Sequence, residues 1–544
     1  MVLLENPVLQ RELLVNLRTL RAFVLLFFYQ ALLATLVYFA WPQDARLDLT
    51  SNPAAARNLV DLFFVGQYVL AALMTPSFAA GAITGEKERK TYELLLATPL
   101  RPSAIVAGKL IASLTHLAVL VFSSLPIVML CLPLGGVSFY EVLAAYLGLI
   151  VSVIAFGMIS VACSSYFHRT AAALVVSYLL ILPFALGGVF LWRTLSDMGQ
   201  FRLVLTVSVV PALGAGVVIA LFANTCRRLL YPPDVGSEGK EVVDLEQEAR
   251  EAVGLVIQRD QFPDRLFAPA RRDSLLPDGA NPVYDKEIRS EIFSQGTLML
   301  RVVIQVSMLV AIPLMAGCLY IWPKYAPWYV SYVLLFNMLV GPVFSAGTVT
   351  SERERQTLDL LLTTPITPWQ ILWGKLIAGL RVSSVLTTFL VWPLLLACLM
   401  VSAYWTNIPA VGGYLAIVLL SCVTTAVIAL FCSVLFHKTS ISLMTAYLVI
   451  IVLFCAPLAA RFFAEGFFPD HEATPHVVRA GLTSPFAATF AIPLDVEIAA
   501  ETASPAVEGD WPLVANFGVF TVGLNLALLS SMIWLFNVRW RVSQ

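Results

Sequence analysis

The chain has 544 residues, of which 59% are hydrophobic and only 13% charged, with a net charge of −1 and a mean hydropathy of +0.83. A soluble protein would carry roughly twice that charged fraction, so the composition excludes a soluble globular chain. The near-neutral charge gives no basic surface for nucleic acid, and eight cysteines without a CxxC pair argue against a metal site, redox chemistry or a secreted disulfide framework.

Apolar stretches long enough to cross a bilayer recur along the whole chain. A helix needs about 20 apolar residues to span the hydrocarbon core. The sequence therefore predicts an all-α integral membrane protein with about twelve transmembrane helices. In chain order, the expected spans are 20–41, 59–83, 105–132, 139–165, 171–192, 203–224, 298–321, 328–350, 370–400, 408–435, 440–463 and 512–536.

Basic residues gather in the loops on one side of these spans. Lys87, Lys90, Arg227 and Arg228 lie on that side, whereas the short loops on the other side carry few lysines or arginines. The positive-inside rule then places both termini in the cytoplasm. We expect a multi-pass protein of the bacterial cytoplasmic (inner) membrane.

The chain contains an internal duplication. Pro76–Ala112 and Pro342–Ala378 align without a gap at an offset of 266, and 21 of their 37 positions are identical. Two shorter motifs recur ahead of each first span and after each fourth span: Asn6-Pro7-Val8 with Asn281-Pro282-Val283, and Phe167-His168-Arg169-Thr170 with Phe436-His437-Lys438-Thr439. The even number of spans per copy makes the two repeats parallel.

This duplication sets the expected domain organisation. The sequence predicts a first six-helix permease repeat over 1–225, a cytoplasmic polar linker over 226–280 and a second six-helix repeat over 281–544. The linker is either a solvated connector with a short amphipathic helix or a small regulatory domain. The second repeat also has a long outer loop, 464–511, with no counterpart in the first.

The centre of each duplicated segment has the pattern of a short cytoplasmic helix. Glu86 and Lys90 are spaced i,i+4, as are Arg89 and Glu93, and ion pairs at this spacing support a helix. Leucines follow at 94–96, and Thr98-Pro99 ends the segment. Either this helix docks on a partner protein, or its charges simply face water and lipid head groups. The docking interpretation selects Glu86, Glu88, Arg89, Thr91, Glu93, Glu352, Glu354, Arg355, Thr357 and Asp359.

The segment resembles the loop between helices two and three of type-2 ABC exporter permeases. The shared pattern is Glu-x-Glu-Arg-x-Thr-x-(Glu/Asp)-Leu-Leu-Leu-x-Thr-Pro, followed by Gly108-Lys109-Leu110 or Gly374-Lys375-Leu376. The resemblance covers essentially the whole chain. It implies an interfacial helix before each first span, over 1–19 and 281–297, and a coupling helix in each duplicated segment. Many members carry one six-helix half per chain, whereas both halves are fused here.

The resemblance also implies a partner that supplies the ATP chemistry. The sequence has no GxxxxGK[ST] phosphate loop, so we expect no catalytic, cofactor-binding or metal-binding residues in this chain. ATP and Mg would be held by a separate ABC ATP-binding subunit, in two copies, whose closure pushes on both coupling helices. Membrane lipids are further expected partners, and nucleic acid is not.

Two other functions remain open at this point. A secondary transporter driven by an ion gradient also commonly has twelve helices in parallel halves. It would need paired carboxylates inside the membrane, whereas Asp61 and Glu141 lie near span ends. An intramembrane enzyme would need a cluster of catalytic side chains in the spans. The exporter permease is the interpretation that the duplicated segment favours.

Overall fold

The structure is a computed structural model in which the chain forms two compact units, Met1–Val242 and Val243–Gln544. The described part of both units is helical and contains no strand, which confirms the predicted all-α class. The structure describes residues 9–10, 27, 29–31, 53–88, 90–131, 138–167, 170–194, 199–230, 281–289, 297–354, 356–405, 407–467, 477, 481–492 and 510–540.

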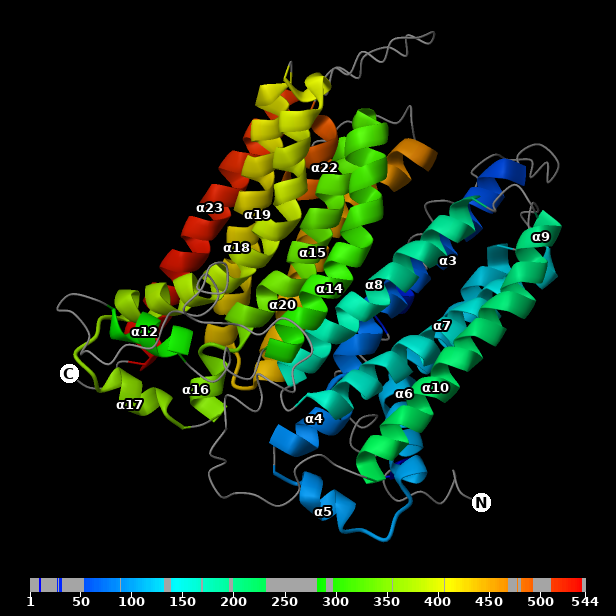
Figure 1. Ribbon diagram of the computed structural model, residues 1–544, viewed down its shortest axis with the longest axis horizontal. Helices are drawn as coiled ribbons and strands as arrows, with labels where there is room; N and C mark the ends of the chain where they lie inside the picture. Colours follow the sequence, from blue (N-terminus) through cyan, green and yellow to red (C-terminus); the bar gives the residue numbers. More distant parts are fainter. Residues whose placement is uncertain are drawn as a thin grey trace. The chain divides into compact units, whose positions relative to one another are not determined.

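The first unit is built around α7, which contacts α3, α6, α8 and α10 along its length. The short helices α4 and α5 lie at one end of these long helices and α9 lies at the other (Figure 1). The elements are α3 (Pro53–Ala79), α4 (Gly81–Glu88), α5 (Tyr92–Leu96), α6 (Pro102–Cys131), α7 (Phe139–Tyr166), α8 (Thr170–Thr194), α9 (Gly199–Val204), the π-helical turn η2 (Leu205–Val209) and α10 (Val210–Leu230).

The second unit repeats this arrangement around α19, which contacts α15, α18, α20 and α23. Its short helices α12, α16 and α17 lie together at one end of the long helices (Figure 1). The elements are α12 (Pro282–Arg289), α14 (Thr297–Met315), η4 (Ala316–Ile321), η5 (Pro323–Tyr325), α15 (Ala326–Ala346), α16 (Thr350–Glu354), α17 (Leu358–Leu362), α18 (Pro368–Met400), η6 (Ser402–Tyr404), α19 (Ile408–Leu435), α20 (Thr439–Phe467), η7 (Gly481–Thr483), α22 (Pro485–Ala491), α23 (Trp511–Leu535) and η8 (Phe536–Trp540).

Local sequence explains why the central helices begin and pack as they do. Ser138 and Glu141 form a capping box at the start of α7, in which each side chain accepts a 3.2 Å hydrogen bond from the other residue's backbone N–H. In α19, Ala426, Ala429 and Ser433 have no exposed surface. Such small side chains let neighbouring helices approach closely, which makes α19 a suitable centre.

Eleven helices in the described residues are long and apolar enough to cross a membrane. They correspond to the second to twelfth expected spans, and α19 has the bounds expected for 408–435. The first expected span, 20–41, lies outside the described residues except for 27 and 29–31. The chain is therefore an integral, multi-pass membrane protein.

The boundary between the two units, at Val242–Val243, lies within the predicted linker 226–280. The last span of the first unit is longer than expected, because α10 continues to Leu230. Residues 231–280 lie outside the described residues, so the linker stays a prediction.

The long loop 464–511 returns to the body of the second unit. Its described part, η7 and α22, contacts α20 and α23, and α22 also contacts α15 and α19. Pro457 lacks an N–H, so the carbonyl of Leu453 one turn earlier has no helical donor. Thr483 Oγ1 donates to that carbonyl at 3.3 Å, and Ser484 Oγ donates to the next carbonyl, that of Phe454, at 2.6 Å. The loop thus supplies hydrogen-bond donors to the α20 carbonyls near the proline.

Candidate functional site

The duplicated segments form two short helices joined by a tight turn at one end of each unit. In the first unit the turn contains Lys90, whose φ is +56°. The Lys90 N–H donates to the Lys87 carbonyl at 3.1 Å, and the Thr91 N–H donates to the Glu86 carbonyl at 2.9 Å. These bonds end α4 with a Schellman motif, which normally places glycine at the left-handed position. In the second unit Gln356 has a φ of +57° and the turn has the same bonds.

This turn corrects the prediction of one continuous helix. The i,i+4 spacing of Glu86 with Lys90 assumes helical geometry through residue 90, whereas α4 ends at Glu88 and α5 begins at Tyr92. The Glu86 carboxylate instead accepts a hydrogen bond from Thr91 Oγ1. It also forms an ion pair with Lys109, with Nζ and Oε1 3.1 Å apart. Arg89 and Arg355 lie outside the described residues, so their i,i+4 pairs with Glu93 and Asp359 stay predictions.

Replacing Lys90 or Gln356 with glycine is expected to stabilise the protein. Glycine adopts positive φ without a Cβ clash, which costs other residues about 1–2 kcal/mol, so each variant should gain up to about 1 kcal/mol in free energy of unfolding. A valine at either position should lower it. The apparent melting temperature of the purified protein measures both, and a glycine variant less stable than the valine variant would contradict the turn geometry.

The end of α4 binds the loop that joins the next two long helices. Lys87 Nζ donates to the carbonyls of Ser165 and Phe167, at 2.7 and 3.1 Å, where α7 ends. Glu88 Oε1 accepts the N–H of Thr170 at 2.7 Å, where α8 begins. A cation at a helix C-terminus and an anion at an N-terminus are both favourable to the helix dipole. In the second unit Arg353 donates to the carbonyls of Val434 and Phe436, at 2.6 and 2.5 Å, and Glu354 accepts from Thr439 N and Oγ1, both at 2.9 Å.

A buried serine of the fourth span holds the start of the same segment. Ser164 Oγ, with no exposed surface, accepts the N–H groups of Ile83 and Thr84, both at 2.9 Å. These donors belong to the first turn of α4, whose N–H groups have no acceptor within that helix. Ser433 repeats the arrangement with Val349 and Thr350, at 3.0 and 3.1 Å.

Replacing Ser433 with alanine is therefore expected to lower the free energy of unfolding by about 1–3 kcal/mol, because two buried N–H groups lose this acceptor. Ser530→Ala is the control, since Ser530 is exposed on α23 and a surface substitution of this kind should stay within about 0.5 kcal/mol. Thermal unfolding of the purified variants measures the difference. Equal melting temperatures for the two variants would show that the Ser433 bonds contribute no stability.

In the second unit a buried charge network ties α12 to α16 and α18. Lys375, with no exposed surface, donates to Glu287 at 2.5 Å and to the Thr348 carbonyl at 2.7 Å, and lies 3.7 Å from Glu352. Glu352 also accepts hydrogen bonds from Lys286 and Thr357. Because Lys286 and Glu287 lie on α12, the network joins this helix to the duplicated segment. Lys109 is the first-unit counterpart of Lys375 and binds Glu86.

Glycine ahead of this lysine allows the close packing of α12. A Cβ on Gly374 would lie 3.0 Å from Asn281 Nδ2 and 3.1 Å from the Tyr284 backbone nitrogen. Asn281 caps α12 by accepting the Val283 N–H at 3.0 Å, and its Nδ2 donates to the Gln370 carbonyl at 2.7 Å. The Gly-Lys pair of the motif therefore has one function in packing and one in charge pairing.

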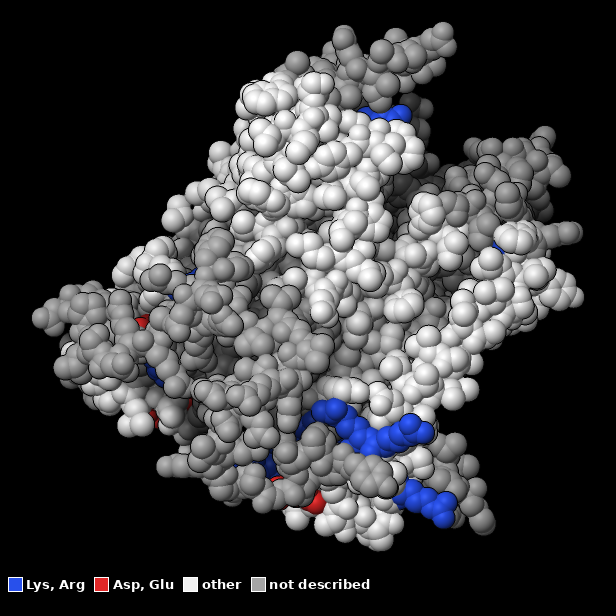
Figure 2. All heavy atoms as spheres, viewed as in Figure 1, with Lys and Arg blue, Asp and Glu red and all other residues white. Residues whose placement is uncertain are grey.

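An acidic residue and a leucine of each segment face outward. Leu94 and Leu360 are 70% and 68% exposed, and Glu93 and Asp359 beside them are exposed. Leu361 and Leu362 instead pack against the buried cluster that contains Val349 and Leu358. In each unit Figure 2 shows coloured charged atoms near the end that carries the short helices, while the sides of the long helices are largely white. Each segment thus presents an acidic residue and a leucine on a fixed support.

The sequence predicted some residues of this site but not the residues that hold the segment against its unit. Glu86, Glu88 and Thr91, with their counterparts Glu352, Glu354 and Thr357, bind other residues of their own unit, whereas Glu93 and Asp359 face away from it. The supporting residues were not assigned a role from the sequence. Their signal was the duplication itself, since each recurs at the matching position: Lys87 with Arg353, Ser164 with Ser433, Thr170 with Thr439, and Lys109 with Lys375.

Two like units of long apolar helices, each with the same bent segment at one end, define a membrane permease built from two fused halves. The sequence model of the ABC-2 family transporter proteins matches residues 8–202 and 213–474, so the chain belongs to this family. Such permeases are typically non-catalytic membrane subunits that work with an ABC ATP-binding partner. No curated protein and no solved structure gives a significant match.

Proposed function

We propose that this chain is the permease subunit of an ATP-driven exporter and that its two duplicated segments bind a separate ATP-binding subunit, one copy under each unit. The observation that supports this most directly is the exposed pair of Glu93 and Leu94, repeated as Asp359 and Leu360, on a segment fixed by buried bonds. An apolar anchor with a polar rim is the usual form of a protein-binding surface. ATP and Mg would be held by the partner.

The hydrogen bonds within each unit would transmit a movement of the duplicated segment to the membrane spans. Closure of the ATP-binding pair would push on α5 and α17, and α4 and α16 would carry the displacement to the ends of the fourth and fifth spans. Glu88 and Glu354 act in this transmission, and Glu86 and Glu352 hold the turn through Thr91 and Thr357. In this proposal the segments and both termini are cytoplasmic, in the inner membrane of a bacterium.

Co-purification with an ATP-binding subunit encoded beside this chain tests the proposal. The complex should contain two ATP-binding copies per chain, hydrolyse ATP faster in lipid than the isolated ATPase and export its substrate only with ATP. Transport driven by a proton gradient without an ATPase would instead support a secondary transporter and overturn the proposal.

Glu88→Ala combined with Glu354→Ala is expected to uncouple or dissociate the ATPase while the permease still inserts and folds. Each carboxylate caps a long helix, so each change should also cost about 0.5–2 kcal/mol of stability. Glu88→Gln with Glu354→Gln is the matched control, because the amide oxygen can still accept the Thr170 and Thr439 N–H groups. ATPase stimulation and co-purification are measured for both, and normal ATP-driven transport in the alanine double variant would contradict a role in coupling.

A further inference from the structure

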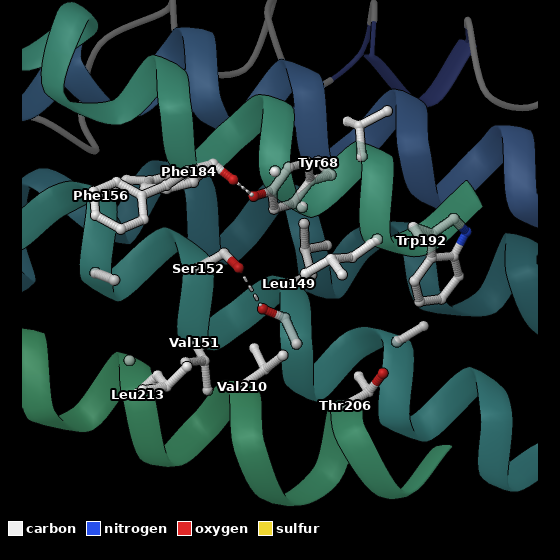
Figure 3. A pocket seen from close by; sticks show the side chains of 18 of the residues that line it. Tyr68, Leu149, Val151, Ser152, Phe156, Phe184, Trp192, Thr206, Val210 and Leu213 are labelled. Atoms are coloured by element: carbon white, nitrogen blue, oxygen red, sulfur yellow. Dashed lines mark hydrogen bonds between the residues drawn. The ribbon is translucent and has the colours of Figure 1, made fainter. Parts of the chain in front are cut away.

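The first unit contains a cavity that the coupling function does not use. It has a volume of about 440 Å³ and lies among α3, α7, α8 and α10. Figure 3 shows Tyr68 and Phe184 on one side of it and Val210 and Leu213 on the other, with Ser152 of α7 between them and Val151 beside Leu213. The lining is largely apolar, and the volume lies in the range of about 300–1,000 Å³ typical of ligand pockets.

In the second unit, the corresponding position among the long helices is occupied by α22. Phe184 lines the cavity. When the repeats are aligned so that Thr170 matches Thr439, Phe184 matches Leu453 of the second unit. The Leu453 carbonyl is bound by Thr483, at the start of the segment that places α22 against α15, α19, α20 and α23. In the first unit, Tyr68 OH donates to the Phe184 carbonyl at 3.1 Å instead. Residues 195–198 alone separate α8 from α9, so among the described residues no segment equivalent to 481–492 follows α8.

One end of the cavity carries polar groups that lack an acceptor. Arg202 is 7% exposed, and its Nη2 donates to Asp61 at 3.0 Å while its guanidinium lies 3.9 Å from the centre of the Trp192 ring. Arg202 Nη1 and Trp192 Nε1 are buried and have no hydrogen-bond partner in the described part of the chain. Each such donor costs about 1–3 kcal/mol while it stays unpaired, so an acceptor here is strongly favoured.

The position of these donors indicates the kind of ligand. Trp192 lies in the last turn of α8, and Arg202 lies on α9, which follows at the same end of the unit. In a membrane protein the ends of spanning helices lie at the level of the lipid head groups, where tryptophan is common. A bilayer phospholipid has this arrangement of parts, with phosphate oxygens at the surface and acyl chains below.

We propose that the first unit binds one phospholipid, with its phosphate at Arg202 Nη1 and Trp192 Nε1 and an acyl chain in the cavity lined by Phe64, Leu149, Phe184 and Leu213. The lipid takes the place that residues 481–492 fill in the second unit. This site is separate from the coupling segments and does not depend on their function.

Native mass spectrometry of the full chain, after exchange from 1-palmitoyl-2-oleoyl-phosphatidylglycerol nanodiscs into detergent, tests the site. The native chain should keep one phosphatidylglycerol. Gly187 lines the cavity and a Cβ added there would have no atom within 4 Å, so Gly187→Leu should place its side chain in the open space and lower retention at least tenfold. Gly216→Leu is the matched control, since Gly216 is equally open but does not line the cavity, and it should keep the lipid.

The head-group contact is tested separately. Trp192→Phe keeps an aromatic ring beside Arg202 but removes the Nε1 donor, and it should lower retention severalfold. Both glycine variants gain helix propensity, so loss of lipid in Gly187→Leu alone reports on the cavity. Equal retention by the native chain and Gly187→Leu would overturn the proposal, as would binding of added palmitate but not of phosphatidylglycerol.

Discussion

Lys375→Met is expected to lower the free energy of unfolding by about 3–5 kcal/mol and the apparent melting temperature by at least about 6 °C. Lys375 has no exposed surface and is the buried cation beside Glu287 and Glu352. Methionine has a similar length but no charge, so buried carboxylates would lose their neutralising partner. Intrinsic fluorescence during heating of the detergent-solubilised protein measures the shift.

Lys286→Met is the control for this prediction, because Lys286 binds the same Glu352 carboxylate from a side chain that is 56% exposed. Without Lys286, Glu352 still has Lys375 at 3.7 Å and the hydrogen bond from Thr357, so this variant should lose less stability than Lys375→Met. If both lysine variants lost the same stability, burial of Lys375 would not be the reason for its effect.

Leu94→Arg combined with Leu360→Arg is expected to abolish co-purification of the ATP-binding subunit. Both leucines are largely exposed, so arginine should be accommodated without loss of folding. At a docked surface, however, each change removes an apolar anchor and places a charge against the partner. Loss of such an anchor costs at least about 2 kcal/mol, so affinity should fall at least about 30-fold at each segment. Titration of the ATPase onto the immobilised permease measures this affinity.

Leu230→Arg is the control for the double variant, since Leu230 is also an exposed leucine, 58% accessible, at the end of α10. It should bind the ATPase like the native chain. Each single variant, Leu94→Arg or Leu360→Arg, should leave one docking segment intact and reduce the stoichiometry to one ATPase copy. Unchanged affinity in the double variant would exclude Leu94 and Leu360 from the interface.

The spans were predictable from the sequence because the bilayer imposes a length and an apolar composition on each one. The bend at Lys90 was not predictable, because lysine gives no sign of a left-handed backbone, which glycine would have indicated. The pair of Lys375 and Glu287 joins residues 88 positions apart, and local spacing says nothing about such pairs. The duplication did mark these residues, but without coordinates it could not separate those that face the unit from Glu93 and Leu94, which face away.

The two bonds at the end of α4 limit how a unit can move. Lys87 holds the last carbonyls of α7 and Glu88 holds the first N–H of α8, so sliding one of these spans past the other would break charge-assisted bonds on both sides of the loop. The fourth and fifth spans and the short helix between them are therefore expected to travel together as one rigid body. Any hinge within the first unit then has to lie outside the junction of α7, α4 and α8.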